Sequence, residues 1–378
     1  MRWGSTRTGL LSPGTAGSIM EKHNENANET IKSVMVFTLI LSLGLLAVNG
    51  LYARGNAEPA KEPASSLPMS STGIISAAQL KSAIDSGDKN LVIIGVINPT
   101  AALVPFSASS RPIEGSYLVW RNDYSGGGTQ EAISPEVTGV RRSKEDMETL
   151  LSKAGVTTNS RIVVYSADSM HDAARLVWQI RLLGLENVGY LDGGANAWID
   201  AGYPTGKALR LAEQQPKNAF KAPSYDTQKL DVNINQVRDA LLNPGEWVVI
   251  DTRTKEEYDG RRTGNSSGAF GTGRMKGVVH INWSDAVDSN TRQLKPKAEL
   301  EKLYGNVIKG KKVITYCQSG VRSAHTWLVL TEALGAGDVY NYDGSWIEWS
   351  YAASEASGSR YADILKLTEE WNDNKKPL

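Results

Sequence analysis

Seven consecutive residues unite a thiol, an arginine, a glycine and hydroxyl side chains: Cys317, Gln318, Ser319, Gly320, Val321, Arg322 and Ser323. They follow a short β-branched run and precede a helical pattern, so we expect a loop between a strand and a helix. In α/β folds ligands bind beyond the carboxyl ends of strands. A loop there directs backbone N–H groups at an anion, and the following helix adds its positive end. These residues therefore predict that Cys317 is a nucleophile with a depressed thiol pKa.

Arg322 adds a full positive charge to the rim of this loop, where we expect it to contact an anion. Gly320 suits a tight reversal that would let five loop amides converge on the thiol. The alternative interpretations are that Cys317 is a small buried apolar residue and that Arg322 is a solvated surface residue.

Two further arginines are candidates for substrate binding. Arg253 ends a strand beside Asp251, and we favour an interpretation in which the two pair and brace the loop. Arg121 follows a strand in the first half of the chain and could line a cleft or lie on a surface loop.

The composition excludes several classes of protein. Cys317 is the only cysteine, so there is no intramolecular disulfide, Cys-rich zinc cluster or Cys-x-x-Cys redox pair. The chain carries 41 Lys+Arg and 41 Asp+Glu with four histidines, which argues against nucleic-acid binding by phosphate neutralisation. No metal or cofactor is predicted.

The chain also repeats itself at a constant offset of 151 residues. The matched pairs are Tyr165 and Tyr316, Ala173 and Ala324, Gly184 and Gly335, Val188 and Val339, Asp192 and Asp343, and Trp198 and Trp349. Each copy alternates strand and helix patterns, which predicts a parallel sheet flanked by α-helices. We therefore expect an α/β fold built by tandem duplication.

The N-terminal segment has a different character. Val34 to Val48 is an uncharged apolar run of 15 residues, short for a membrane-spanning helix and typical of a signal peptide. Export with cleavage and an uncleaved membrane anchor both remain open, and either would place the protein in the periplasm or cell envelope. Residues 58–72 are rich in Pro, Ala and Ser, which is typical of a flexible tether.

The motifs together resemble the tandem-domain rhodanese family, the thiosulfate and 3-mercaptopyruvate sulfurtransferases. They are the loop beginning at Cys317, Asp251–Arg253, Gly273–Trp283, Leu191–Gly194 and Tyr342–Trp349. In this family the C-terminal domain holds the active cysteine and the N-terminal domain is catalytically silent. Ser166 stands at the position equivalent to Cys317, and its loop contains no arginine.

The resemblance implies two rhodanese-like domains, each with a parallel β-sheet flanked by α-helices. The boundaries we expect are an N-terminal extension over 1–57, a tether over 58–72, a silent domain over 73–205, a linker over 206–231, a catalytic domain over 232–358 and a C-terminal tail over 359–378.

The resemblance further implies a double displacement. Cys317 would take sulfur from a small anionic donor as a persulfide and pass it to cyanide or a thiol. Thiosulfate-type loops often carry lysine where this chain has Ser319, and mercaptopyruvate enzymes typically place a substrate-binding arginine where it has Glu257. The donor therefore stays open between the two, and the oligomeric state is not predicted.

Two other functions remain open. A phosphatase of the Cys-Arg loop class needs five residues between cysteine and arginine, whereas this loop has four. A non-enzymatic persulfide carrier would use the same loop, and the sequence separates it poorly from an enzyme.

Overall fold

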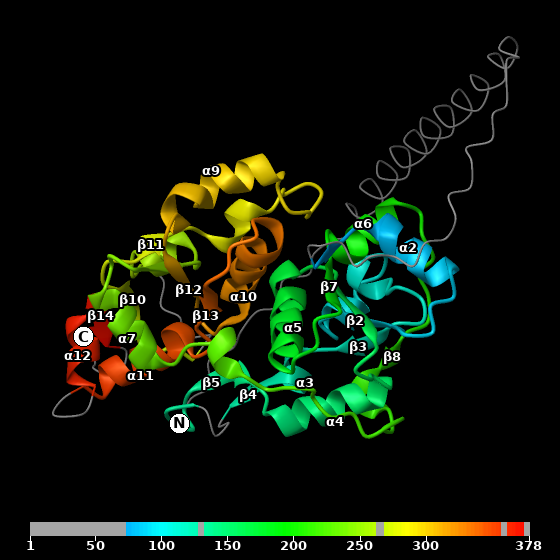
Figure 1. Cartoon of the computed structure of the whole chain (residues 1–378), viewed down its shortest axis with the longest axis horizontal. Helices are drawn as coiled ribbons and strands as arrows, with labels where there is room; N and C mark the ends of the chain where they lie inside the picture. The colour runs from blue at the N-terminus through cyan, green and yellow to red at the C-terminus, as the bar shows by residue number, and fades with distance from the viewer. Residues whose placement is uncertain (1–72, 128–131, 262–267, 357–360, 374–378) are drawn as a thin grey trace, which may run out of the picture. The chain divides into compact units, whose positions relative to one another are not determined.

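The computed structural model describes residues 73–127, 132–261, 268–356 and 361–373. The extension over 1–57 and the tether over 58–72 lie outside these residues. Within the described ranges, no helix has both the length and the apolar character needed to cross a membrane. The predicted fold class is confirmed: two α/β domains each contain a parallel sheet with helices on its faces (Figure 1).

The first domain contains a six-stranded sheet in which every neighbouring pair is parallel. Its strands in spatial order are β1 (Ile74–Ile75), β7 (Val188–Leu191), β6 (Arg161–Ser166), β2 (Leu91–Val96), β3 (Tyr117–Val119) and β8 (Leu209–Arg210). The carboxyl end of β6 leads into the silent loop, which begins at Ser166.

Successive side chains of the central strands enter different apolar clusters, as expected for a sheet buried on both faces. Val163 of β6 packs in the cluster that contains residues of α2 and α6, whereas Val164 packs with α4 and α5. These helices are α2 (Ala77–Asp85), α4 (Lys144–Ala154), α5 (Met170–Leu182) and α6 (Gly194–Asp200).

The second domain repeats this plan with a four-stranded parallel sheet. Its strands in spatial order are β11 (Val279–His280), β9 (Trp247–Asp251), β12 (Lys312–Tyr316) and β13 (Val339–Asn341). Its principal helices are α7 (Ile234–Leu242), α9 (Lys297–Ile308), α10 (Val321–Leu328) and α11 (Ser345–Ser354). Val313 packs with α9 and α10, and Ile314 with α7 and α11.

Helices α5 and α10 pack against each other, one from each domain (Figure 1). Their residues belong to one apolar cluster that includes α4 and α9. Each helix follows the loop at the end of the corresponding strand, β6 or β12. Because these helices occupy equivalent places in the repeat, the packing brings the silent loop and the catalytic loop to one region of the molecule.

Two segments differ from the boundaries expected from sequence. The predicted linker contains β8, which pairs with β3 of the first sheet. The predicted tail contains α12 (Ala362–Lys366) and β14 (Thr368–Asp373), and β14 pairs antiparallel with β10 (Gly271–Met275). Both strands lie at the edge of the structure and lack a sustained apolar alternation, so the sequence pattern does not reveal them.

Four short elements complete the surroundings of the site. They are α3 (Arg121–Tyr124), β4 (Ser125–Gly127), β5 (Thr138–Arg141) and α8 (Lys255–Tyr258).

Candidate active site

The catalytic loop connects β12 to α10 and is held by the start of α11. Ser345 Oγ accepts hydrogen bonds from the amides of Cys317 (3.2 Å) and Gly320 (2.9 Å). In the other direction, the amide of Trp346 donates to the carbonyl of Cys317 (3.1 Å), and that of Ile347 to the carbonyl of Gln318 (3.0 Å). These bonds fix the loop to α11 through both its donors and its acceptors.

The loop reverses at Gly320, the residue before α10, whose φ of 73° lies in the left-handed region that glycine tolerates. A tight reversal is therefore present. The amides of Ser319 and Ser323 lower the pKa of the Cys317 thiol, whereas the amides of Cys317 and Gly320 donate to Ser345 Oγ. Ser345, from the element after the next strand, thus engages two amides of the loop.

The thiol of Cys317 is buried, with 1% of the residue exposed. Burial by itself would raise the thiol pKa, but the positive charge of Arg322, the Ser323 hydroxyl and the amides of Ser323 and Ser319 outweigh it. The net effect lowers the pKa of Cys317 below its usual value. The single proton of the Ser323 hydroxyl faces two acceptors, the Cys317 sulfur at 3.6 Å and Asn341 Oδ1 at 2.6 Å. A stabilised thiolate is the chemical property that this loop provides.

Arg322 stands on the rim but is not without a partner. Its Nη1 and Nη2 donate to the two carboxylate oxygens of Glu257 on α8, at 2.7 and 2.9 Å. Burial would raise the pKa of Glu257, but the hydrogen bonds and charge of Arg322 lower it to about 2. The guanidinium is thus fixed by one anion while it stabilises a second, the thiolate.

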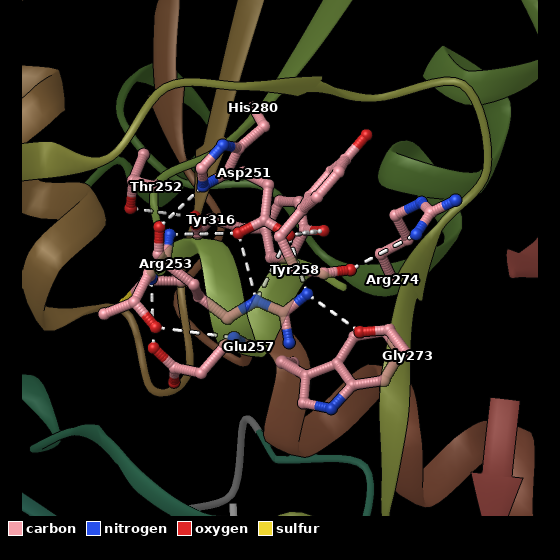
Figure 2. Close-up of polar contacts among 12 residues, drawn as sticks. Asp251, Thr252, Arg253, Glu257, Tyr258, Gly273, Arg274, His280 and Tyr316 are labelled. Carbon is pink, nitrogen blue, oxygen red and sulfur yellow. Dashed lines mark hydrogen bonds and ion pairs between the residues drawn. The ribbon is translucent and has the colours of Figure 1, made fainter. Parts of the chain in front are cut away.

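Arg253 lies in the interior with 1% of the residue exposed. Its guanidinium donates to the carboxylate of Asp251 and to the Gly273 carbonyl at 2.9 Å (Figure 2). It also lies over the ring of Trp346. Asp251 also accepts from the Tyr316 hydroxyl, one residue before Cys317. Arg253 therefore braces the strand before the loop, as the favoured interpretation of the sequence expected.

The silent domain contributes contacts that the sequence did not indicate. Arg175 of α5 donates from Nη1 to the Gly320 carbonyl at 3.3 Å, and its Nη2 pairs with Asp343. The other oxygen of Asp343 accepts from the amide of Arg141 at 2.9 Å and from its Nη1 at 3.2 Å. Gly139 lies against Ser319 of the catalytic loop. Arg175 is one of two arginines in the helical pattern over 173–183, so residue type alone did not single it out.

Arg121 comes from the silent domain as well. Its Nε and Nη2 donate to the buried carboxylate of Asp172 at 2.7 and 3.0 Å. Burial lowers the pKa of Arg121, but Asp172 and more weakly the nearby Cys317 raise it overall. Of the two positions that the sequence left open, a surface loop and a cleft wall, the proximity to Cys317 favours the cleft wall.

The remaining loop residues lie close around the thiol. Gln318 and Val321 are 5% and 6% exposed, and Ser323 is fully buried. In the silent loop, the Ser166 hydroxyl is also buried and lies 3.9 Å from the Met170 sulfur. Within the described residues, no group of three or more His, Cys, Asp or Glu side chains is arranged to hold a metal ion.

Comparison of this chain with models of known protein families shows the family to which it belongs. The model of the rhodanese-like domain matches this chain twice, over residues 76–201 and 235–352. The chain belongs to the rhodanese family. The predicted duplication is thereby confirmed, because the two matches correspond to the two α/β domains.

Curated relatives agree with this membership. A protein of Mycobacterium tuberculosis named as a thiosulfate sulfurtransferase, SseA, is 35% identical and aligns over 55% of this chain and 69% of its own length. A thiosulfate sulfurtransferase of Corynebacterium glutamicum is 33% identical over 53% and 66% of the two chains. A sulfur carrier protein of Thermus thermophilus, TtuD, is 30% identical over 55% and 74%. The two relatives named as sulfurtransferases confirm the predicted enzyme class, a rhodanese-type sulfurtransferase.

Solved structures share the fold at lower sequence identity. The 3-mercaptopyruvate sulfurtransferase SseA of Escherichia coli is 22% identical with a TM-score of 0.57, over 73% of this rhodanese and 99% of that chain. The anaerobic ergothioneine biosynthesis enzyme of Chlorobium limicola is also 22% identical, with a TM-score of 0.62 over 74% and 68%.

Proposed function

We propose that this rhodanese transfers sulfane sulfur from thiosulfate, or alternatively from 3-mercaptopyruvate, to cyanide or a thiol through a persulfide on Cys317. The observation that carries this proposal is the loop around the chain's only thiol, where Arg322, Ser323 and two amides lower the pKa of a fully buried sulfur. The names of the relatives from Mycobacterium and Corynebacterium support thiosulfate as the donor.

The first half-reaction begins with the Cys317 thiolate. It attacks the outer sulfur of thiosulfate, a new S–S bond forms, and the bond to the inner sulfur breaks as sulfite leaves with the electron pair. The Cys317 persulfide stays anionic, and the amides of Ser319 and Ser323, together with the Arg322 charge, stabilise it.

In the second half-reaction, cyanide or a thiolate attacks the terminal sulfur of the persulfide. The bond between the two sulfurs breaks, and its electrons return to Cys317 as the thiolate. The cycle consumes no external oxidant or reductant.

The test is a persulfide on Cys317. Incubation with thiosulfate should add the mass of one sulfur atom to the intact protein, and later cyanide should remove it as thiocyanate. Cys317→Ser should take up no sulfur and should retain less than about a tenth of the wild-type rate, because a serine hydroxyl is not an accessible anion at neutral pH. Ser166→Ala is the matched control and should keep its activity. Sulfur transfer by Cys317→Ser at the wild-type rate would refute the proposal.

A second candidate is a persulfide carrier that delivers sulfur to a partner protein, and the 30% identity to the carrier TtuD favours it. The protein that carries the Cys317 persulfide can be used to distinguish an enzyme from a carrier. An enzyme should discharge its sulfur to cyanide or a small thiol over many turnovers, whereas a carrier should hold the persulfide after the small acceptor is added.

We also propose that the protein is exported to the periplasm or attached to the cell envelope. The apolar run from Val34 to Val48 supports this. Cell fractionation and N-terminal sequencing of the mature protein would distinguish a cleaved signal from an anchor, and recovery of the uncleaved chain in the cytosolic fraction would contradict both.

A further inference from the structure

Sulfur donors of the proposed reaction carry a negative charge, so the site needs a group that receives it. Arg322 was the expected group, but both of its terminal nitrogens already donate to Glu257. The carboxylate of Glu257 is 10% exposed and fully ionised at neutral pH, since its pKa is about 2. A donor anion would therefore have to compete with a bidentate ion pair for Arg322.

The silent domain offers another cation near the thiol. Asp172, which is fully buried, holds Nε and Nη2 of Arg121. No hydrogen bond from the described residues reaches Nη1, and 44% of the side chain is exposed. Asp172 thus fixes the orientation of the guanidinium and leaves one nitrogen directed away from the pair. The Cys317 thiolate is close enough to raise the pKa of Arg121.

His171 lies beside Arg121, on the first turn of α5. Its Nε2 lies 3.4 Å from Arg121 Nη2, and its ring packs edge-on against Trp283 of the catalytic domain, with centroids 4.6 Å apart. His171 Nδ1 is buried and has no hydrogen-bond partner among the described residues. If Arg121 donates to Nε2, the proton of the neutral ring lies on Nδ1, which is then a buried donor without an acceptor.

The repeat gives His171 a particular position, because it is the equivalent of Arg322 at the offset of 151 residues. Helix α5 packs against α10, and Arg175 near the start of α5 donates to the carbonyl of Gly320 at the start of α10, so both starts lie in the same region. Burial is the main reason that the pKa of His171 falls to about 4; Asp172 opposes this, while Arg121 and Arg322 add to it. His171 is therefore a neutral ring close to two cations.

We propose that Arg121 and His171 form the subsite that receives the anionic end of the sulfur donor. The proposal rests on the proposed function. Arg121 supplies the charge through Nη1, and His171 supplies the Nδ1 proton to a sulfonate or carboxylate oxygen. When thiosulfate reacts, the same two groups hold the oxygens of the departing sulfite. They specify the donor and take no part in the attack of the acceptor.

The reaction has two half-reactions, so kcat/KM for the donor and kcat/KM for cyanide report on the two steps separately. Arg121→Met should lower kcat/KM for thiosulfate about tenfold to a hundredfold, the scale of a charge-assisted hydrogen bond. His171→Phe keeps the packing on Trp283 but loses the donor, and should lower it about threefold to tenfold. Neither variant should change kcat/KM for cyanide. His171→Asn, whose amide nitrogen lies near the position of Nδ1, should recover part of the loss.

Two controls keep the result interpretable. Arg142→Met removes an arginine of the same domain that donates to the Asn122 carbonyl, and it should leave both constants unchanged. Arg121→Met leaves Asp172 buried without its principal partner, so Arg121→Met/Asp172→Asn tests whether this orphaned charge causes the effect. If the double variant regains wild-type use of thiosulfate, the proposal is wrong.

A binding measurement separates this proposal from the proposed function. Thiosulfate added to full-length Cys317→Ser should raise the pKa of His171, followed by imidazole NMR, because an anion stabilises the imidazolium. The shift should disappear in Arg121→Met/Cys317→Ser. A shift without persulfide formation in the wild type would refute the proposed function alone. Persulfide formation with unchanged His171 signals and unchanged donor kinetics in Arg121→Met would refute the subsite alone.

Discussion

At the scale of single residues, the guanidinium of Arg322 interacts with two anions, the Glu257 carboxylate and the Cys317 thiolate. Arg322 is fixed by the Glu257 carboxylate and at the same time lowers the pKa of Cys317. Although it is paired, Arg322 makes the largest contribution to lowering the pKa of Cys317. The pair explains how a site without surplus positive charge can hold a thiolate.

Arg322→Ala should raise the thiol pKa, because it removes a cation while the Ser319 and Ser323 amides remain. The rate of reaction with iodoacetamide, measured against pH, should reach half its maximum at a higher pH than in the wild type. At neutral pH, kcat/KM for the donor should fall about tenfold to a hundredfold. Much of this loss should return above the new pKa, where the thiolate forms again.

The matched control for this prediction is Arg322→Ala/Glu257→Gln, in which no carboxylate is left unpaired beside the thiol. It should show a smaller rise of the thiol pKa than Arg322→Ala. An unchanged pKa in Arg322→Ala would mean that the backbone amides and Ser323 alone stabilise the thiolate.

At the scale of elements, the loop between β12 and α10 keeps its conformation because a third element, α11, is hydrogen-bonded to it. The loop between β12 and α10 is bonded to the first turn of α11 through Ser345, and its reversal depends on Gly320. The carbonyl of Asp343 and the Nη1 atom of Arg175 would lie 2.7 Å from a Cβ at Gly320. The glycine is therefore required both for its φ of 73° and for the space around it.

Gly320→Ala should impair the enzyme more than a comparable substitution elsewhere. Left-handed backbone costs an L-residue about 1–2 kcal/mol. In addition, the new methyl group would be too close to Arg175 and Asp343, so the loop would have to shift. Gly335→Ala has nearly the same φ, 72°, with nothing within 4 Å of its Cβ, and is the matched control. Thermal unfolding should show a similar strain cost in both variants, whereas only Gly320→Ala should lose sulfur transfer by tenfold or more. Equal activity in the two variants would contradict this account.

At the scale of the whole molecule, the silent domain is part of the catalytic site. Arg175 donates to the Gly320 carbonyl across the contact between α5 and α10, and Asp343 joins it to Arg141. A domain without a thiol thus retains a role, since it orders the loop of the other domain.

Arg175→Met should destabilise the fold and displace the catalytic loop. Removing one partner of a buried ion pair costs about 3–5 kcal/mol, and the remaining partner Arg141 reduces this for Asp343. Urea unfolding should report the loss, and sulfur transfer should fall at pH values where Cys317 is ionised. Arg175→Met/Asp343→Asn should recover stability but not the contact with Gly320, so activity should stay low. Full activity in the double variant would show that the silent domain does not position the loop.

The N-terminal segment gives a prediction of its own. A chain beginning near Ser71 should be soluble and active, because the apolar run precedes the first strand and a tether separates the two. Gel filtration and the thiocyanate assay would test this. An insoluble product, with the full chain well behaved in detergent, would place the domain boundary elsewhere.

The sequence by itself determined the duplication and the α/β class, and it indicated Cys317 as the candidate nucleophile. These depend on local patterns: the offset of 151 residues, the alternation of strand and helix, and a single thiol in a loop after a buried strand. It also indicated the pairing of Arg253 with Asp251, two residues apart. Each of these features is expressed within a short stretch of chain, where periodicity and residue type carry the information.

Only the tertiary structure decided which groups surround the thiol. The partner of Arg322 is Glu257, 65 residues away, and Ser345 accepts hydrogen bonds from two amides of the loop. Arg175 reaches Gly320 from 145 residues away. Such contacts depend on how helices pack across and between sheets, which no local pattern encodes. The charge balance of the site is therefore a property of the folded chain.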